Sequence, residues 1–257
     1  QFVPALLEDN PSMTHDDPEY EQRLEGLGSK ALVEAMRYGN WDVVEGAFFD
    51  CWDPQRHVVR PFVVPDSWLR FMSGDWLTDL TAWLSANCMV RYREWYGASK
   101  PNVGLKMHAD AVARGILARE AKDSKAQTPT YRVLDPAAFA EDGGQSIAHA
   151  MHAVKLDGRC TIFRPADNAR VPGRGAMGGW DQMRGRMVGD EAGAPMIVAF
   201  STCLDSIRTI PALMHDKAKA EDLDSDMEDH AADEWRYGCM SRPWVRALQN
   251  AGKPESR

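Results

Sequence analysis

The sequence predicts a mixed α/β domain, in which a sheet of parallel and antiparallel strands is flanked by helices. Two observations predict this class. Strand-like segments follow one another without an intervening helix over residues 68–96, which is typical of a meander. Beyond residue 108, helical and strand-like segments alternate, which is typical of helices that cross between the strands of one sheet.

The individual elements follow from the spacing of apolar residues. The predicted strands are short apolar runs bounded by turn-forming or acidic residues: 68–75, 80–84, 89–96, 131–135, 160–163 and 196–200. The predicted helices repeat apolar residues every three or four positions: 108–121, 146–156, 180–188, 204–213 and 226–240. Residues 166–179 are rich in Gly, Arg and Pro, so they predict a loop.

The chain divides into a linker arm, residues 1–60, and a larger domain, residues 61–257. The arm carries turn and cap signals near its start, and Gly26 and Gly28 interrupt its main helical stretch. The first residues show no basic region followed by an apolar core, so we expect no signal peptide. We expect the sequence to be an internal part of a longer protein.

Composition restricts the class of protein and its partners. Hydrophobic residues make up 44% and charged residues 26%, which is an ordinary globular balance. No apolar run approaches the roughly 18 residues of a membrane helix, so we expect no membrane partner. The five cysteines are widely spaced without a C-x-x-C pair, which favours a reducing cytosol over disulfides or a zinc site. Because the net charge is −8, any contact with DNA must come from a local basic strip, aided by bound cations.

Acidic residues are concentrated on one face of the last predicted helix. At about 100° per residue, Asp226, Asp229, His230 and Asp233 fall within an arc of roughly 100°. Carboxylates crowded in this way repel one another unless a cation lies among them, and Mg²⁺ and Mn²⁺ prefer oxygen ligands. The alternative is a solvated face at a helix start, where the helix dipole favours acids.

Two further acids end predicted strands. Asp75 follows an apolar run and precedes Trp76, and Asp135 follows Val133-Leu134. Taken singly, each is better explained as a residue of a terminating turn. Together with the acidic helix they supply what two-metal phosphodiester hydrolysis needs, where one ion activates water and the other stabilises the leaving oxygen.

Several stretches of the chain resemble one family. Nearly the whole length is similar to the nuclease region of phage terminase large subunits and the arm that follows their ATPase domain. Asp229-His230-Ala231-Ala232-Asp233 and Leu134-Asp135-Pro136-Ala137 carry the resemblance most directly. Further matches, in the family's order, are residues 4–11, 39–46, 91–97, 164–168, 179–182 and 236–237.

The resemblance implies an RNase H-like fold with acids on the first strand, the fourth strand and the last helix. In this chain they match Asp75, Asp135 and Asp233, with His230 as a companion and Asp229 as a further metal ligand. The implied cofactors are two Mg²⁺ or Mn²⁺ ions. The implied partners are double-stranded DNA, the portal protein, the small terminase subunit and the ATPase domain of the same full-length chain, in the host cytoplasm.

The chain departs from the family after the first acid. The family usually has Asp-Trp-Gly there, whereas Trp76 is followed by Leu77 and a shortened stretch to Cys88. The first two strands must therefore turn tightly, or the second is altered. Asp79 is a lesser alternative ligand in this stretch.

Phosphate contacts are expected from the Gly/Arg loop and the short helix after it. The predicted DNA-binding residues are Arg170, Arg174, Arg184 and Arg186. The alternative is an ordinary solvated loop. A dinucleotide site at Gly173–Gly178 is disfavoured because prolines separate it from the preceding strand, and no complete phosphate-loop motif occurs.

These observations predict a metal-dependent endonuclease that cuts concatemeric viral double-stranded DNA during packaging. The rival interpretation is a non-catalytic docking module that contacts the portal or the small subunit. The altered stretch after Asp75 favours the rival.

Overall fold

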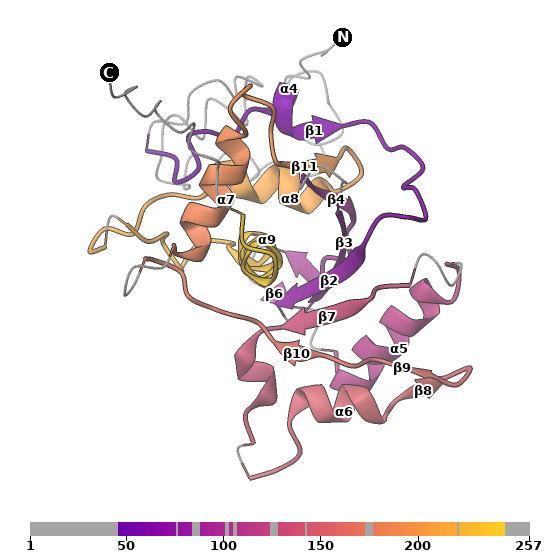
Figure 1. Ribbon diagram of the computed structural model, residues 1–257. Coiled ribbons are helices and arrows are strands. Elements are labelled where there is room, and N and C mark those ends of the chain that lie inside the picture. The colour runs from indigo at the N-terminus through magenta and orange to yellow at the C-terminus, as the bar shows by residue number, and fades with distance from the viewer. Residues whose placement is uncertain are drawn as a thin grey trace, which may run out of the picture.

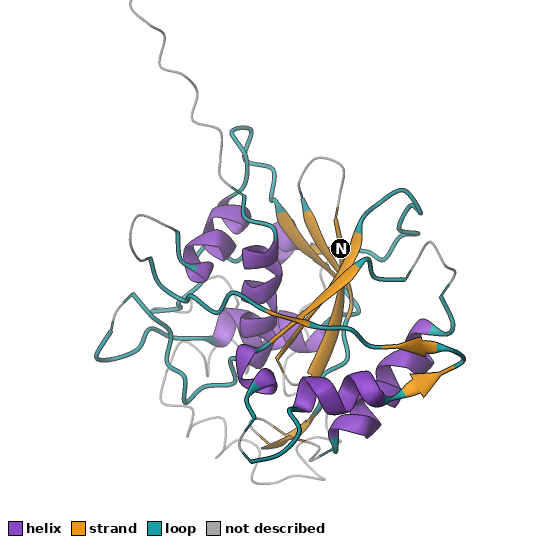
Figure 2. Ribbon diagram, turned by 60° about the horizontal axis from the view of Figure 1, so that its bottom comes forward, coloured by secondary structure: helices purple, strands orange, loops and turns teal. Residues whose placement is uncertain are grey.

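The protein was analysed as a computed structural model. It describes residues 46–75, 77–83, 88–100, 103–104, 107–123, 128–141, 143–172, 177–219 and 221–244. Within these ranges a seven-stranded mixed sheet is flanked by helices (Figures 1 and 2), which confirms the predicted α/β class. No helix within them has the length and apolar character needed to cross a membrane.

The central sheet has the strand order β1-β11-β4-β3-β2-β7-β10. Only β3 runs against its neighbours among these seven strands, so the carboxyl ends of the others meet at one edge. The strands are β1 (Val58–Val59), β2 (Arg70–Asp75), β3 (Leu77–Trp83), β4 (Met89–Arg93), β7 (Tyr131–Leu134), β10 (Arg164–Pro165) and β11 (Ile197–Phe200). Two small hairpins lie outside the sheet: β5 (Ala98–Lys100) with β6 (Val103–Gly104), and β8 (Lys155–Leu156) with β9 (Arg159–Cys160).

The helices cover the two faces of the sheet, and alternation along β2 decides which face each residue serves. Phe71 belongs to the core beneath α7 (Gly179–Val188), α8 (Leu204–Thr209) and α9 (His230–Ser241). Met72 belongs to the core beneath α5 (Ala109–Glu120) and α6 (Ile147–Ala153). Figure 1 shows the first group on the upper side of β2 and β7 and the second group below them. The remaining short helices are α4 (Pro54–His57), η3 (Pro136–Phe139) and η4 (Ile210–Ala212).

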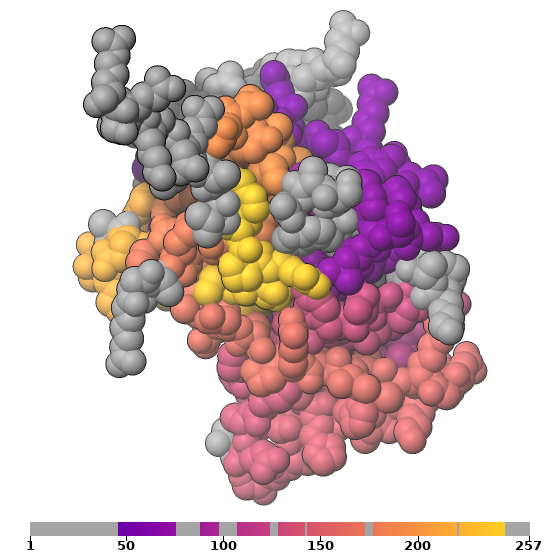
Figure 3. Space-filling model, in the orientation of Figure 1, coloured from indigo at the N-terminus to yellow at the C-terminus, as the bar shows by residue number. Residues whose placement is uncertain are grey.

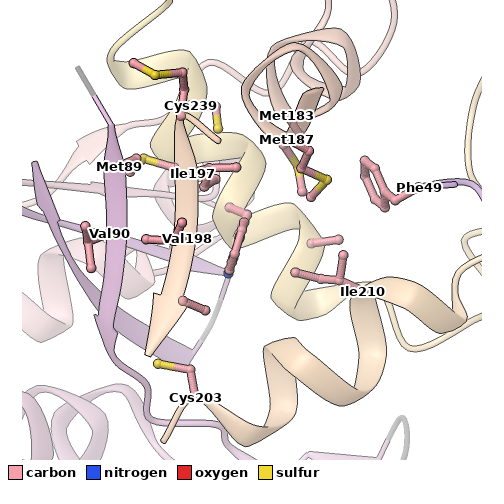
Figure 4. Close-up of a cluster of buried hydrophobic side chains, with 14 of the residues drawn as sticks. Phe49, Met89, Val90, Met183, Met187, Ile197, Val198, Cys203, Ile210 and Cys239 are labelled. Carbon is pink, nitrogen blue, oxygen red and sulfur yellow. The ribbon is translucent and has the colours of Figure 1, made fainter. Parts of the chain in front are cut away.

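The larger core lies between the sheet and the α7–α9 layer. Figure 4 shows Met183 and Met187 of α7 facing Phe49, with Ile197 and Val198 of β11 beside them. These side chains are buried and belong to one continuous cluster. This packing fixes α9 against the strands that carry the acids.

The predicted boundary at residue 60 is wrong for the part that the structure describes. Ala47, Phe48 and Phe49 are core residues, and β1 pairs with β11 in the central sheet. Residues 46–60 therefore belong to the domain rather than to a separate arm. The predicted arm over residues 1–45 lies outside the described residues.

The last predicted helix begins later than expected. α9 starts at His230 with Asp229 as its N-cap, so Asp226 precedes the helix and does not share its acidic face. The backbone NH of Asp226 instead donates to Asp224 Oδ1. Ala231 and Trp235 form part of the buried side of the helix and are no more than 1% exposed.

Candidate active site

The two strands that end in acids are neighbours, as predicted. β2 and β7 pair in parallel with Gly74 opposite Leu134, and the backbone NH of Asp135 donates to the carbonyl of Gly74 at 3.0 Å. Asp75 and Asp135 are therefore held side by side at the carboxyl edge of the sheet. β3 follows at once, with Leu77 paired to Asp75, so the two strands turn as tightly as the sequence requires.

Helix α9 brings the third acid to the same edge. It crosses β2 closely because Gly238 has no side chain: a Cβ there would lie 3.3 Å from Ser73 Oγ and 3.5 Å from the Phe71 ring. Asp233, in the first turn, and the N-cap Asp229 both interact electrostatically with Asp75. In the space-filling view the yellow C-terminal atoms of the described chain reach the surface at the centre of the face shown (Figure 3).

The acids are largely withdrawn from water while close to one another. The side chains of Asp75, Asp229 and Asp233 are 11%, 13% and 14% exposed. Burial raises the pKa of Asp75, and the carboxyls of Asp233 and Asp135 raise it further, against the opposing effect of His230. Burial and then Asp233 raise the pKa of Asp229 to about 7. A group of buried carboxylates lowers the stability of the folded protein unless cations compensate its negative charge.

His230 is the most exposed member of the group. Its Nδ1 lies 2.9 Å from Asp75 Oδ2, and this hydrogen bond raises the pKa of His230 to about 9. The side chain is 47% exposed, so it is accessible from solvent while Asp75 behind it is not. A histidine in this position can orient a water molecule or carry a proton.

Each carboxylate has a protein partner. Asp135 Oδ1 accepts from the backbone NH of Ala137 at 2.7 Å, and its Oδ2 accepts from the Tyr237 hydroxyl at 3.0 Å. Asp233 Oδ1 accepts from Arg236 Nε at 2.9 Å and forms an ion pair with Arg236 Nη2 at 2.8 Å. With the side chains in these positions, no three His, Cys, Asp or Glu residues among those described are spaced to hold one metal ion.

The predicted basic strip does not form an exposed surface. Arg186 is fully buried and donates to the carbonyls of Met196 and Arg242, so in this position it cannot contact a phosphate. Arg184 donates to the Phe48 carbonyl and stacks on that ring. The periodic spacing that suggested a basic helix face does not reveal which arginines point into the core.

Arg170 has a different role from the predicted one. Its Nε pairs with Asp222 at 3.0 Å, its Nη2 lies 3.7 Å from Asp229, and its guanidinium lies over Trp180. It therefore partly neutralises the acidic group instead of extending into solvent. Arg174 and residues 173–176 of the glycine motif lie outside the described residues, as does the side chain of Asp79, and Gly178 is the N-cap of α7.

Sequence reasoning missed three residues next to the acids. Glu234 is buried and forms a 2.6 Å ion pair with Arg91 of β4, which attaches α9 to the sheet. Arg236 and Tyr237 hold Asp233 and Asp135. The i, i+3 spacing of Asp233 and Arg236 is the one signal that could have suggested the first of these pairs.

Comparison with solved structures identifies the fold. The large terminase from a thermophilic bacteriophage, in complex with ADP, matches with a TM-score of 0.55 and 18% identity, over 93% of this chain and 54% of that protein. The P22 large terminase nuclease domain matches with a TM-score of 0.52 and 17% identity, over 79% of this chain and 95% of that domain. The chain has the fold of a large terminase nuclease domain.

The terminase resemblance found in the sequence is thus confirmed at the level of fold. The chain spans 54% of the length of the thermophilic phage terminase that it matches. No protein-family model matches the chain, and no curated protein matches it either. The terminase fold places Asp75, Asp135 and α9 together, and the chemistry has to be argued from those residues.

Proposed function

We propose that this terminase domain is a divalent-metal-dependent endonuclease that cuts concatemeric viral double-stranded DNA when packaging begins and ends. The observation that carries the proposal is the meeting of three acids at one sheet edge: Asp75 on β2, Asp135 after β7 and Asp233 on α9. A meander of β2, β3 and β4 with β7 parallel to β2 is the arrangement we expect of an RNase H-like fold.

The donor set fits two Mg²⁺ or Mn²⁺ ions. Carboxylate oxygens are the ligands that these hard cations prefer, and burial, followed by the neighbouring acids, raises the pKa values of Asp75 and Asp229. A two-ion site divides its carboxylates between the ions, so it does not require three side chains around either one. We expect Asp75, Asp135 and Asp233 to hold the ions, with Asp229 as a further ligand.

Asp75, Asp135 and Asp233 would hold the ions, and the chemistry that the ions would supply is activation of the attacking water and neutralisation of the leaving oxygen. Asp135 and Asp233 keep their oxygens in place through bonds to Tyr237 and Arg236. His230, hydrogen-bonded to Asp75 and open to solvent, would orient the water. DNA is held through its phosphates, which gives position rather than sequence choice.

The partners follow from the same proposal. The ATPase domain of the full-length chain, the small terminase subunit and the portal protein would bring DNA to the domain in the host cytoplasm. A second candidate function is a non-catalytic docking module for the portal or the small subunit. The immediate pairing of Asp75 with Leu77 favours it, because that turn differs from the family pattern around the first acid.

Nicking of supercoiled plasmid in Mn²⁺ tests the proposal. Asp135→Asn and Asp233→Asn keep the acceptors for Ala137 and Arg236 but remove the charge, so we expect loss of nicking with a native circular-dichroism spectrum. The alanine variants should also lose nicking, and His230→Ala should be slower but active. Nicking should fall steeply with salt and show little sequence preference.

Asp190→Asn is the matched control. Asp190 also accepts from backbone NH groups in a turn, at Ala192 and Ala194, but it is remote in sequence from all the acids. It should nick like the parent. Full nicking by both Asp135→Asn and Asp233→Asn would contradict the mechanism. A parent that never nicks with any divalent metal would favour the docking module.

A further inference from the structure

Two consecutive residues of α9 each bind a different acid of the candidate site. Arg236 donates through Nε to Asp233 Oδ1, one helical turn earlier, and its Nη2 lies 2.8 Å from the same oxygen in an ion pair. Tyr237 donates its hydroxyl to Asp135 Oδ2, which belongs to the neighbouring part of the sheet edge. One helix therefore supplies an acid and also the partners of two acids.

Arg236 lies in a space shaped for its side chain. The residue is 2% exposed, and its guanidinium lies 5.0 Å from the Trp180 ring centre and 4.5 Å from that of Tyr237. Gly179 leaves room on the third side, because a Cβ there would be 2.3 Å from Arg236 Cγ. Enclosed on these sides, the guanidinium is directed at Asp233.

Burial of the Arg236 guanidinium costs folding free energy, and stability gained from the ion pair does not explain why this side chain is buried here. Arg236 Nη1 is buried without a hydrogen-bond partner among the described residues. A buried ion pair with an unsatisfied donor contributes little to stability compared with apolar side chains of the same size. Both of its contacts end on one oxygen of Asp233, so the other oxygen takes no part in the pair.

Tyr237 is held just as firmly. Its ring is 2% exposed and packs with Val133 and Ala166 of the β7–β10 edge. Its hydroxyl donates to Asp135 Oδ2 at 3.0 Å. The hydroxyl and the backbone NH of Ala137 together fix both oxygens of Asp135.

We propose that Arg236 and Tyr237 are positioning residues, which hold the carboxylates of Asp233 and Asp135 in orientation for divalent cations. This inference rests on the proposed nuclease function. Hydrogen bonds to metal-ligating carboxylates hold the ligands in orientation, and their loss typically lowers metal affinity or activity about 10–100-fold.

The test compares Arg236→Met and Tyr237→Phe with two matched controls in the full chain. Arg93→Met removes an arginine that also pairs twice with an aspartate, Asp123, at 2.7 and 2.9 Å. Tyr131→Phe removes a hydroxyl that also contacts the end of α9, at Ser241 and at the C-cap Arg242. Within the described part of the chain, neither control residue has a hydrogen bond or ion pair to the proposed ligands.

Calorimetric titration with Mn²⁺, in the absence of DNA, gives the affinity directly. We expect both site variants to bind Mn²⁺ at least about tenfold more weakly than the parent. Their nicking should fail at limiting Mn²⁺ and recover in part as Mn²⁺ is raised, which a loss of folded protein would not produce. The two controls should keep the parent affinity.

If Arg236→Met does not fold, Tyr237→Phe still tests whether a positioning residue sets the affinity for Mn²⁺, because this substitution removes a single oxygen atom. Parent-like Mn²⁺ affinity in folded Tyr237→Phe, or in folded Arg236→Met, overturns the assignment of that residue while leaving the nuclease proposal intact. A parent that neither binds Mn²⁺ nor nicks DNA overturns both proposals.

Discussion

At the scale of the single residue, burial and hydrogen bonds determine which groups can carry charge. His57 is fully buried at the end of α4 and stacks on Trp52. Its Nε2 donates to the Met187 carbonyl and its Nδ1 accepts from the backbone NH of Asp53, each at 2.9 Å. The bond to Met187 requires a proton on Nε2, and Nδ1 also lies 2.9 Å from the carbonyl oxygen of Asp53.

This environment predicts a pH dependence of stability. Burial lowers the pKa of His57 in the folded protein below its ordinary value of 6.5, so below that pH the unfolded chain binds a proton that the folded protein does not. The contribution of neutral His57 to the free energy of unfolding is constant above pH 6.5 and is lost as pH falls below that value. Urea unfolding gives the free energy of unfolding at pH 7.5 and at pH 5.5. Between these two pH values the parent should lose about 1 kcal/mol more of that free energy than His57→Gln does. Equal losses in both proteins would contradict the neutral state.

The candidate acids could be predicted because each has a local signal. Asp75 and Asp135 follow apolar runs, and Asp233 lies on an acidic helix face. Arg236 and Tyr237 could not be assigned roles in the same way, since their partners are set by packing across α7 and β7. Arg186 was misassigned for the same reason: only the fold shows that it lies beneath the surface.

At the scale of elements, the end of α7 depends on one glycine. Gly189 follows the helix with φ of 98°, in a region that residues with side chains rarely adopt. A Cβ there would also lie 2.2 Å from the carbonyl oxygen of Ala194. The turn that leads from α7 into β11 therefore has no room for a side chain.

Gly189→Ala should destabilise the domain by about 1–3 kcal/mol, because it combines backbone strain with a backbone clash. Thermal unfolding measures the loss. Gly144→Ala is the control, since a Cβ at Gly144 meets nothing within 4 Å and the residue has no positive φ. Equal melting temperatures for the two variants would show that the α7–β11 turn can rearrange.

Long elements with clear periodicity were predicted closely, and short ones were not. The helix predicted at residues 108–121 is α5, and the strand predicted at 196–200 is β11. β1 and β10 have two residues each, too few for a pattern, and they exist because a neighbouring strand supplies hydrogen bonds. Residues 226–229 carry a helical pattern but form turns that precede α9.

At the scale of the whole molecule, the net charge of −8 and the buried acids act in the same direction. Both favour binding of cations to the native state. Mg²⁺ or Mn²⁺ at millimolar concentration should therefore raise the melting temperature, by about 2–4 °C for each kcal/mol of binding free energy. Asp233→Asn should show a smaller rise.

Sodium chloride at equal ionic strength is the necessary comparison, because screening alone weakens repulsion between acids. A rise that sodium chloride reproduces in full would exclude a formed metal site. A rise that requires the divalent ion, and that Asp233→Asn diminishes, would support one.

The parallel pairing of β2 with β7 also governs when the acids can meet. Parallel neighbours need a long crossover, here through β4 and α5, before Asp75 and Asp135 stand side by side. Asp233 arrives only when α9 folds across them. During synthesis, the ribosome must therefore release nearly all of the described chain before the acid cluster is complete, and an unfinished chain carries no assembled cluster.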